Sequence, residues 1–316
     1  MLEAIIYITI GLVVLLASGD ILVRGAVAMA RALNIPALLV SLTIVAFGTS
    51  APELVVAIQA VLNNSDGIAL GNIIGSNIAN VLLVIGLPAL IYPMSTHVEG
   101  LRRHGAFLLI ATAVFMGIAY SLGEVSRLAG YGLFVGIVAY ISYTGYRALT
   151  AGDDAMLDDV EEYGDGGLSI RTILFLLFGL IGLPLGAHLL VKYGAFLAAD
   201  LGVRDEVIGL TIIAFGTSLP ELATVAAAAV HRKSDVAIGN IVGSNIFNIL
   251  AVGGAAGIAG GARFDASSLS LDLPIMGAAT LLLAGYVFAR RDITRVSGVA
   301  MTLAYAVFIL LIAQSL

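Results

Sequence analysis

Ten apolar segments, each long enough to cross a lipid bilayer, follow one another along this chain of 316 residues. The chain is 60% hydrophobic and only 11% charged, whereas soluble domains are about a quarter charged. We therefore predict an all-α membrane protein with ten transmembrane helices. These lie at about residues 4–32, 36–62, 67–92, 104–121, 128–149, 170–200, 206–230, 235–261, 270–289 and 296–315.

The two halves of the chain are copies of one another, related by a shift of 168 residues. "TIVAFGTSAPEL" (Thr43–Leu54) corresponds to "TIIAFGTSLPEL" (Thr211–Leu222). "IALGNIIGSNIAN" (Ile68–Asn80) aligns without a gap with "VAIGNIVGSNIFN" (Val236–Asn248). Because five spans is an odd number, the second copy is expected to enter the membrane from the opposite side. Two such halves are related by a pseudo-twofold axis in the membrane plane, which is typical of secondary transporters.

The predicted domain boundaries follow from this duplication. The first five-helix repeat covers residues 1–149, an acidic linker covers 150–169, and the second, inverted repeat covers 170–316. The α-repeats, which carry the duplicated motifs, lie at about 39–88 and 207–256. We interpret the linker as a solvated tether between the halves. A regulatory cation site is the alternative, but the spacing of the linker's acids does not fit an EF-hand loop.

Positive charge is distributed unevenly between the two ends of the predicted helices. One end would carry Arg31, Arg102, Arg103, Arg147, Arg171, Arg232, Lys233, Arg290, Arg291 and Arg295. The other end would carry Arg127, Arg204 and Arg263. Because loops rich in Lys and Arg stay in the cytoplasm, we predict that the linker is cytoplasmic and that both termini lie outside.

A glutamate directly follows a proline in both copies of the first motif, as Pro52–Glu53 and Pro220–Glu221. A proline inside a helix cannot donate to the carbonyl one turn earlier, so carbonyls are expected to leave the helix ladder here. Such backbone is tolerated at membrane depth only where it is buried in protein or lines a cavity. An ionised carboxylate at that depth costs on the order of 3 kcal/mol, so we interpret both acids as functional.

Two carboxylates that meet across the pseudo-twofold axis repel each other unless one is protonated or a cation lies between them. Ser50 and Ser218 add hydroxyl groups beside the acids. Carboxylate, carbonyl and hydroxyl oxygens are the ligands that Ca²⁺ takes, six to eight at a time. The sequence therefore predicts an oxygen-lined cation site between Glu53 and Glu221.

The span after each acid carries amide and hydroxyl side chains at i, i+4 and i+8, which share one helix face. They are Asn72, Ser76 and Asn80 in the first half, and Asn240, Ser244 and Asn248 in the second. These groups can coordinate an ion, or they can simply hold helices together by hydrogen bonds, and both interpretations remain open. The paired G-x-x-x-G spacing on the same spans indicates close helix packing.

Other polar residues favour structural roles. Asp20 and His188 occupy equivalent positions, and we interpret them as interfacial or helix-packing groups rather than a proton relay. An intramembrane hydrolase with Ser50 or Ser218 as nucleophile would need a nearby base, and the motif spans offer no His or Lys. We therefore predict that the protein is not an enzyme.

These motifs resemble the α-repeats of the cation/calcium exchangers, and most closely the sodium/calcium exchanger branch of prokaryotic type. The resemblance implies ions between the second, third, seventh and eighth spans, with the first and sixth helices as a sliding pair. It implies Ca²⁺ bound by Glu53 and Glu221 with main-chain oxygens of Thr49 and Thr217. The implied Na⁺ ligands are Ser50, Ser76 and Ala46 in one repeat and Ser218, Ser244 and Ala214 in the other, with Asn80 and Asn248 lining the middle position.

One position narrows what the resemblance implies. Potassium-dependent members of the family typically carry Asp where this chain has Asn248. Asparagine here argues against K⁺ dependence and lowers the charge of the central site. The proton-coupled branch resembles this chain less, because its repeats lack the G-T-S-x-P-E form.

We expect an antiporter that exchanges Ca²⁺ for Na⁺ by alternating access. A Ca²⁺/H⁺ antiporter of the same fold and a passive cation channel remain the alternatives. We expect no cofactor beyond the transported Ca²⁺ and Na⁺, and no obligate protein partner. The chain has no basic tract, so nucleic acid is not an expected partner. The expected location is the lipid bilayer of a prokaryotic cytoplasmic membrane.

Overall fold

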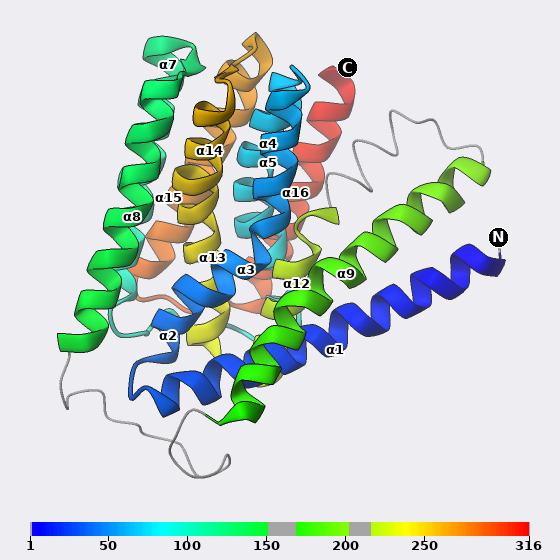
Figure 1. The fold of residues 1–316 in the computed structure, drawn as a ribbon, viewed down its shortest axis with the longest axis vertical. Helices are drawn as coiled ribbons and strands as arrows, with labels where there is room; N and C mark the ends of the chain where they lie inside the picture. The colour runs from blue at the N-terminus through cyan, green and yellow to red at the C-terminus, as the bar shows by residue number, and fades with distance from the viewer. Residues whose placement is uncertain (1, 151–168, 202–215, 316) are drawn as a thin grey trace.

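In the computed structural model, the described residues 2–150, 169–201 and 216–315 are almost entirely helical (Figure 1). The first half contains α1 (Leu2–Ala32), α2 (Ala37–Val40), η1 (Ser41–Val45), α3 (Ala46–Thr49), α4 (Ala51–Leu62), α5 (Asp66–Ala79), η2 (Asn80–Val84), α6 (Gly86–Ile91), α7 (Leu101–Leu122) and α8 (Arg127–Thr150). The second half contains α9 (Ile170–Asp200), α12 (Leu219–Val230), α13 (Ser234–Phe247), η4 (Asn248–Val252), α14 (Gly253–Ala259), η5 (Ser268–Asp272), α15 (Leu273–Ala289) and α16 (Arg295–Ser315). Two short strands, β1 (Glu124–Val125) and β2 (Ala262–Arg263), pair antiparallel.

Eight helical runs among the described residues are long and apolar enough to span a membrane, and a bent pair adds a ninth. The bent pair joins residues 37–49 to residues 51–62 at an angle of 43°. The predicted span at 206–230 lies partly outside the described residues, and its described part is the apolar helix α12. The chain is therefore an all-α, multi-pass membrane protein, and ten spans stay a prediction.

The two longest described helices, α1 and α9, lie side by side at a marked tilt to the other helices (Figure 1). They run antiparallel, since Gly11 faces Gly186 whereas Gly25 faces Leu176. A Cβ atom on Gly186 would lie 2.8 Å from the carbonyl oxygen of Gly11. Small residues of this kind let the backbones of membrane helices approach closely.

The centre of the bundle is formed by the runs α5–η2–α6 and α13–η4–α14. In the most apolar part of each run, 83% of the residues are buried, compared with 44% or less in the other six long spans. Helices with so little lipid contact are free to carry polar side chains on several faces, because protein rather than lipid surrounds them. These two runs carry the amide and hydroxyl residues of the predicted site.

The loops gather at two opposite ends of the bundle. At one end, Met94 bridges to Ile293. At the other end, Glu124 pairs with Arg263 in the β1–β2 ladder. The last turn of α8 and the first turn of α9 lie at the end opposite to the C-terminus of the chain (Figure 1). Helix α8 therefore ends, and α9 begins, on the same side of the bundle.

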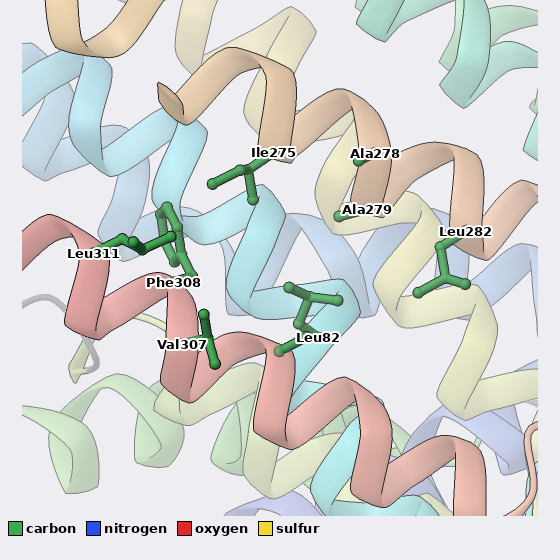
Figure 2. A pocket seen from close by; sticks show the side chains of 9 residues that line it. Leu82, Ile275, Ala278, Ala279, Leu282, Val307, Phe308 and Leu311 are labelled. Atoms are coloured by element: carbon green, nitrogen blue, oxygen red, sulfur yellow. The ribbon is translucent and has the colours of Figure 1, made fainter. Parts of the chain in front are cut away.

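A groove of about 390 Å³ lies between α15, α16 and η2 (Figure 2). Its walls are apolar, and it is lined by Leu82, Ile275, Ala278, Ala279, Leu282, Ala304, Val307, Phe308 and Leu311. Val307 is 54% exposed and Leu311 is 41% exposed, so the groove opens on the outer surface of two membrane spans. Its lining offers no polar side chain to a cation.

Candidate functional site

Both copies of the G-T-S-x-P-E motif interrupt helical geometry just before the proline. Ser50 has φ −91° and ψ 7°, and Ser218 has φ −86° and ψ 1°. Pro52 and Pro220 are then the second residues of α4 and α12, where a missing N–H leaves no helical bond unmade. The prediction of a proline inside a helix is therefore wrong in detail, because a new helix begins immediately before each proline.

This break places each acid in the first turn of a helix, Glu53 in α4 and Glu221 in α12. The first turn of a helix carries a partial positive charge, which offsets part of the cost of burying a carboxylate. Both glutamates are 0% exposed, and the negative charge of Glu221 acts on Glu53. The two acids therefore both lie in the interior of the protein, within range of each other's charge, and do not point into lipid.

Hydroxyl groups from both repeats hold Glu221. The Oγ of Ser50 donates to Oε1 of Glu221 at 2.9 Å, and the Oγ of Ser244 donates to the same oxygen at 3.5 Å. The Oε2 of Glu221 and both carboxylate oxygens of Glu53 are buried without a hydrogen-bond partner among the described residues. Three carboxylate oxygens are thus available to a cation.

Thr49, the last residue of α3, joins the first repeat to α13 of the second. Its Oγ1 donates to Oδ1 of Asn240 at 3.3 Å and lies 3.4 Å from the Oγ of Ser244. Close packing of α13 against η1 permits these contacts, since a Cβ on Gly243 would lie only 2.6 Å from the carbonyl oxygen of Leu42. The predicted ligands of the two halves therefore share one interface.

Helix α5 supplies the matching face from the first repeat. The Nδ2 of Asn72 donates to the main-chain carbonyl of Glu53 at 3.0 Å, which ties α5 to α4. Asn80 and Asn248 begin the π-helical turns η2 and η4, a widened geometry that is frequent at functional sites. Because η2 packs against α12 and η4 against α4, each amide lies on an element beside the other repeat's acid-bearing helix.

Ten of the twelve predicted ligands are buried in the structure. They are Ala46, Thr49, Ser50, Glu53, Ser76, Asn80, Ser218, Glu221, Ser244 and Asn248. Thr217 is half-buried, and Ala214 lies outside the described residues. Besides the acids, Ser218 Oγ and the Oδ1 atoms of Asn80 and Asn248 are buried without a partner in the described part of the chain.

One polar contact between α1 and the end of α12 was not predicted. Asp20 of α1 pairs with Arg24 at 2.9 Å and with His231, the residue that directly follows α12. Since Asp20 and His231 are far apart in the sequence, no local pattern signals this contact. It agrees with the interpretation of Asp20 as a helix-packing group, because it joins α1 to the helix that carries Glu221.

The atoms that the site offers to a metal ion are oxygens. Hydrogen-bond acceptors outnumber hydrogen-bond donors among its polar groups. Across residues 2–150, 169–201 and 216–315, no group of three or more His, Cys, Asp or Glu side chains could hold a metal ion. Two carboxylates surrounded by hydroxyl and amide oxygens suit hard cations such as Ca²⁺ rather than metals that prefer nitrogen or sulfur. The arrangement can therefore bind a cation that neutralises it.

Comparisons with known proteins show which family this chain belongs to. The family model described as sodium/calcium exchanger protein matches residues 3–149 and 171–314. The putative antiporter CaxA of Alkalimonas amylolytica is 38% identical, over 96% of this chain and 97% of its own. The sodium/calcium exchanger MaX1 of Methanosarcina acetivorans is 32% identical, over 96% of each chain.

Among solved structures, the sodium-calcium exchanger NCX_Mj superposes with a TM-score of 0.83 at 28% identity, over 97% of each chain. The fold and the sequence thus point the same way along nearly the whole chain. The resemblance inferred from the duplicated motifs is confirmed, and the chain belongs to the sodium/calcium exchanger protein family, whose members are transporters.

Proposed function

We propose that this protein is an antiporter that exchanges Ca²⁺ for Na⁺, with the ions bound between Glu53 and Glu221. The observation that carries the proposal is a pair of fully buried carboxylates with three oxygens that have no partner among the described residues. Relatives named as sodium/calcium exchangers support Na⁺ as the coupling ion. A Ca²⁺/H⁺ antiporter would use the same carboxylates and is separated by the experiment below.

The charge of the site accounts for coupling. Two ionised glutamates are balanced by one Ca²⁺ or by two Na⁺, and a third Na⁺ would make the cycle electrogenic. Without a cation, the two buried carboxylates retain their desolvation cost and their mutual repulsion. Conversion between outward- and inward-facing forms then proceeds only when bound ions neutralise the acids, because the ions bias that equilibrium.

The proposed ligands are oxygens from both repeats. Ca²⁺ would take Glu53 and Glu221 with the main-chain oxygens of Thr49 and Thr217. The remaining proposed ligands, for Na⁺ and for the middle position, are Ala46, Ser50, Ser76, Asn80, Ala214, Ser218, Ser244 and Asn248. The hydrogen bonds of Ser50 and Ser244 to Glu221 support this set. They hold the two hydroxyl oxygens close to Oε1 of Glu221, so one cation can contact a hydroxyl oxygen and the carboxylate together.

The proposed frame is ten spans in two inverted five-helix repeats, with α1 and α9 as the pair that slides. The antiparallel contact of α1 with α9 supports this frame, because inverted copies must run in opposite directions. We place the linker in the cytoplasm and both termini outside, on the distribution of Arg and Lys.

The test is radiolabelled Ca²⁺ uptake into proteoliposomes, with outward gradients of Na⁺, K⁺ and H⁺ imposed one at a time. Uptake that requires internal Na⁺ at fixed pH on both sides supports the proposal. Uptake driven by internal acid without Na⁺ would assign the protein to Ca²⁺/H⁺ exchange. Uptake that needs no counter-ion gradient would indicate a channel.

Acidification should inhibit Na⁺-driven Ca²⁺ uptake. Protons and cations compete for the same carboxylates, so cation affinity falls as pH falls. Lowering the pH on both sides together from about 8 to about 5 should therefore raise the KM for Ca²⁺ progressively. A flat KM across this range would contradict the assignment of paired carboxylates as the ion ligands.

Potassium should not stimulate transport. Asn248 is neutral, and it stands where potassium-dependent relatives are expected to carry an acid, so the site has no additional charge for K⁺. Equal uptake with K⁺ or choline as the balancing cation, at constant Na⁺ and with the membrane potential clamped, is the expected result. Marked stimulation by K⁺ would show that the inference from Asn248 is wrong.

A further inference from the structure

Four buried asparagines lie on segments that pack against one another, α5 and η2 of the first repeat and α13 and η4 of the second. Asn77 and Asn245 occupy equivalent positions in the two repeats, three residues before Asn80 and Asn248 respectively. All four are 1% exposed or less. Only Asn80 and Asn248 belong to the proposed ligand set. Asn77 and Asn245 lie off the i, i+4, i+8 face, and the proposed function gives them no role.

The hydrogen bonds around Asn245 have only one consistent direction. Its Nδ2 lies 3.3 Å from the main-chain carbonyl oxygen of Asn77, which can accept a hydrogen bond but not donate one. Asn245 must therefore turn Nδ2 to that carbonyl and Oδ1 to Asn80. The Nδ2 of Asn80 donates to this oxygen at 3.0 Å. The orientation of both amides thus follows from their partners.

The far end of the Asn80 amide is its Oδ1 atom. That oxygen is buried and has no hydrogen-bond partner among the described residues. A reversed amide would instead direct two N–H donors away from Asn245, and these would repel a cation. Asn245 consequently decides which end of the Asn80 amide has no hydrogen-bond partner in the described part of the chain.

We propose that Asn245 is a positioning residue, which turns the Asn80 amide so that its oxygen rather than its NH₂ group faces the bound cation. This inference rests on the proposed cation site and assigns Asn245 no contact with the ion. The direction is set by the backbone carbonyl of Asn77, so it does not depend on the rotamer of another side chain. Preorganisation of this kind removes the cost of orienting a ligand when the ion binds.

The other half of the site lacks this relay. Asn77, the equivalent of Asn245, uses its Nδ2 to donate to the carbonyl of Ile73 at 2.7 Å. Both amide atoms of Asn248 are buried without a partner in the described part of the chain. The middle of the site is therefore asymmetric, with Asn80 held as an oxygen ligand and Asn248 not held in this way. Asn77 consequently offers a matched control.

The decisive experiment compares Asn245→Ala in two backgrounds. In the wild-type background it should raise the KM for Ca²⁺ about five- to tenfold, the effect of one lost orienting hydrogen bond, with little change in kcat. In an Asn80→Asp background the same substitution should leave the KM unchanged or lower it, because a carboxylate presents oxygen at both ends. Asn77→Ala should leave the KM near the wild-type value, since the relay uses only the main-chain carbonyl at that position.

Equilibrium binding of radiolabelled Ca²⁺ to the purified protein gives a second readout for each variant. If Asn245→Ala does not yield folded protein, Asn245→Ser replaces it, because a serine hydroxyl can donate or accept and does not force one orientation. An unchanged KM in Asn245→Ala, an equal rise in the Asn80→Asp background, or an equal rise in Asn77→Ala would overturn the inference. Absence of Na⁺-driven uptake by the wild-type protein, with Ca²⁺ binding retained, would instead overturn the proposed function.

Discussion

Replacement of either Glu53 or Glu221 by glutamine should abolish Ca²⁺ uptake into Na⁺-loaded proteoliposomes. Each substitution removes one of the two negative charges of the site. At an effective dielectric constant of about 20, one unit charge about 4 Å from another contributes about 4 kcal/mol, or roughly a thousandfold in affinity. Glutamine keeps the size of the side chain, so the expected loss comes from charge rather than from packing.

The same variants should fold as well as the wild-type protein. A buried carboxylate without a partner is costly, so a neutral side chain should leave the melting temperature unchanged or raise it when no cation is present. Addition of Ca²⁺ should stabilise the wild-type protein, by about 2.7 kcal/mol at a concentration of 100 times Kd, and should not stabilise the variants. Thermal unfolding of purified protein with and without Ca²⁺ measures both effects.

Glu99→Gln provides the matched control, because Glu99 is an exposed glutamate in the loop before α7. It should transport at the wild-type rate and keep the stabilisation by Ca²⁺. Near-normal uptake by Glu53→Gln or Glu221→Gln would remove the acids from the mechanism. A melting temperature well below that of the wild-type protein would mean that the loss of transport reflects misfolding instead.

The functional role of the two acids could be predicted from the sequence, because the motif that contains them occurs twice. A single glutamate in an apolar segment can mark a short loop, but Glu53 and Glu221 recur in equivalent frames with the same flanking residues. The burial of both acids agrees with that prediction. The sequence also predicts a membrane protein, since ordinary soluble domains do not carry so many long apolar segments.

Details that depend on backbone geometry could not be predicted in this way. The sequence predicts that Pro52 lies inside a helix, whereas one helix ends at Thr49 and a new one begins at Ala51. A regular helical pattern also places Asn245 beside the site face rather than on it. Its contact with Asn80 joins residues that are distant in the sequence, as does the contact of Asp20 with His231.

Substitution of Gly243 by valine should destroy the site from a position that holds no ligand. A Cβ atom at Gly243 would lie 2.6 Å from the carbonyl oxygen of Leu42 and 2.7 Å from the Cβ of Ala46. These neighbours are backbone or a side chain that cannot rotate away, so α13 must move away from η1 and α3. That movement separates Ser244 from Thr49, and with them the two halves of the proposed ion site.

Even Gly243→Ala should lower stability, and the sign of its effect tests the packing directly. Alanine is favoured over glycine inside a helix by about 1 kcal/mol, so local propensity alone predicts stabilisation. Overpacking against neighbours that cannot give way costs about 1–3 kcal/mol, so the contact with Leu42 should outweigh propensity.

Gly117→Ala isolates the propensity effect, because an added Cβ there meets no atom within 4 Å among the described residues. A lower melting temperature and a raised KM for Ca²⁺ are therefore expected for Gly243→Ala but not for Gly117→Ala. If both variants were equally stable and active, close approach of α13 to η1 would not be what assembles the site.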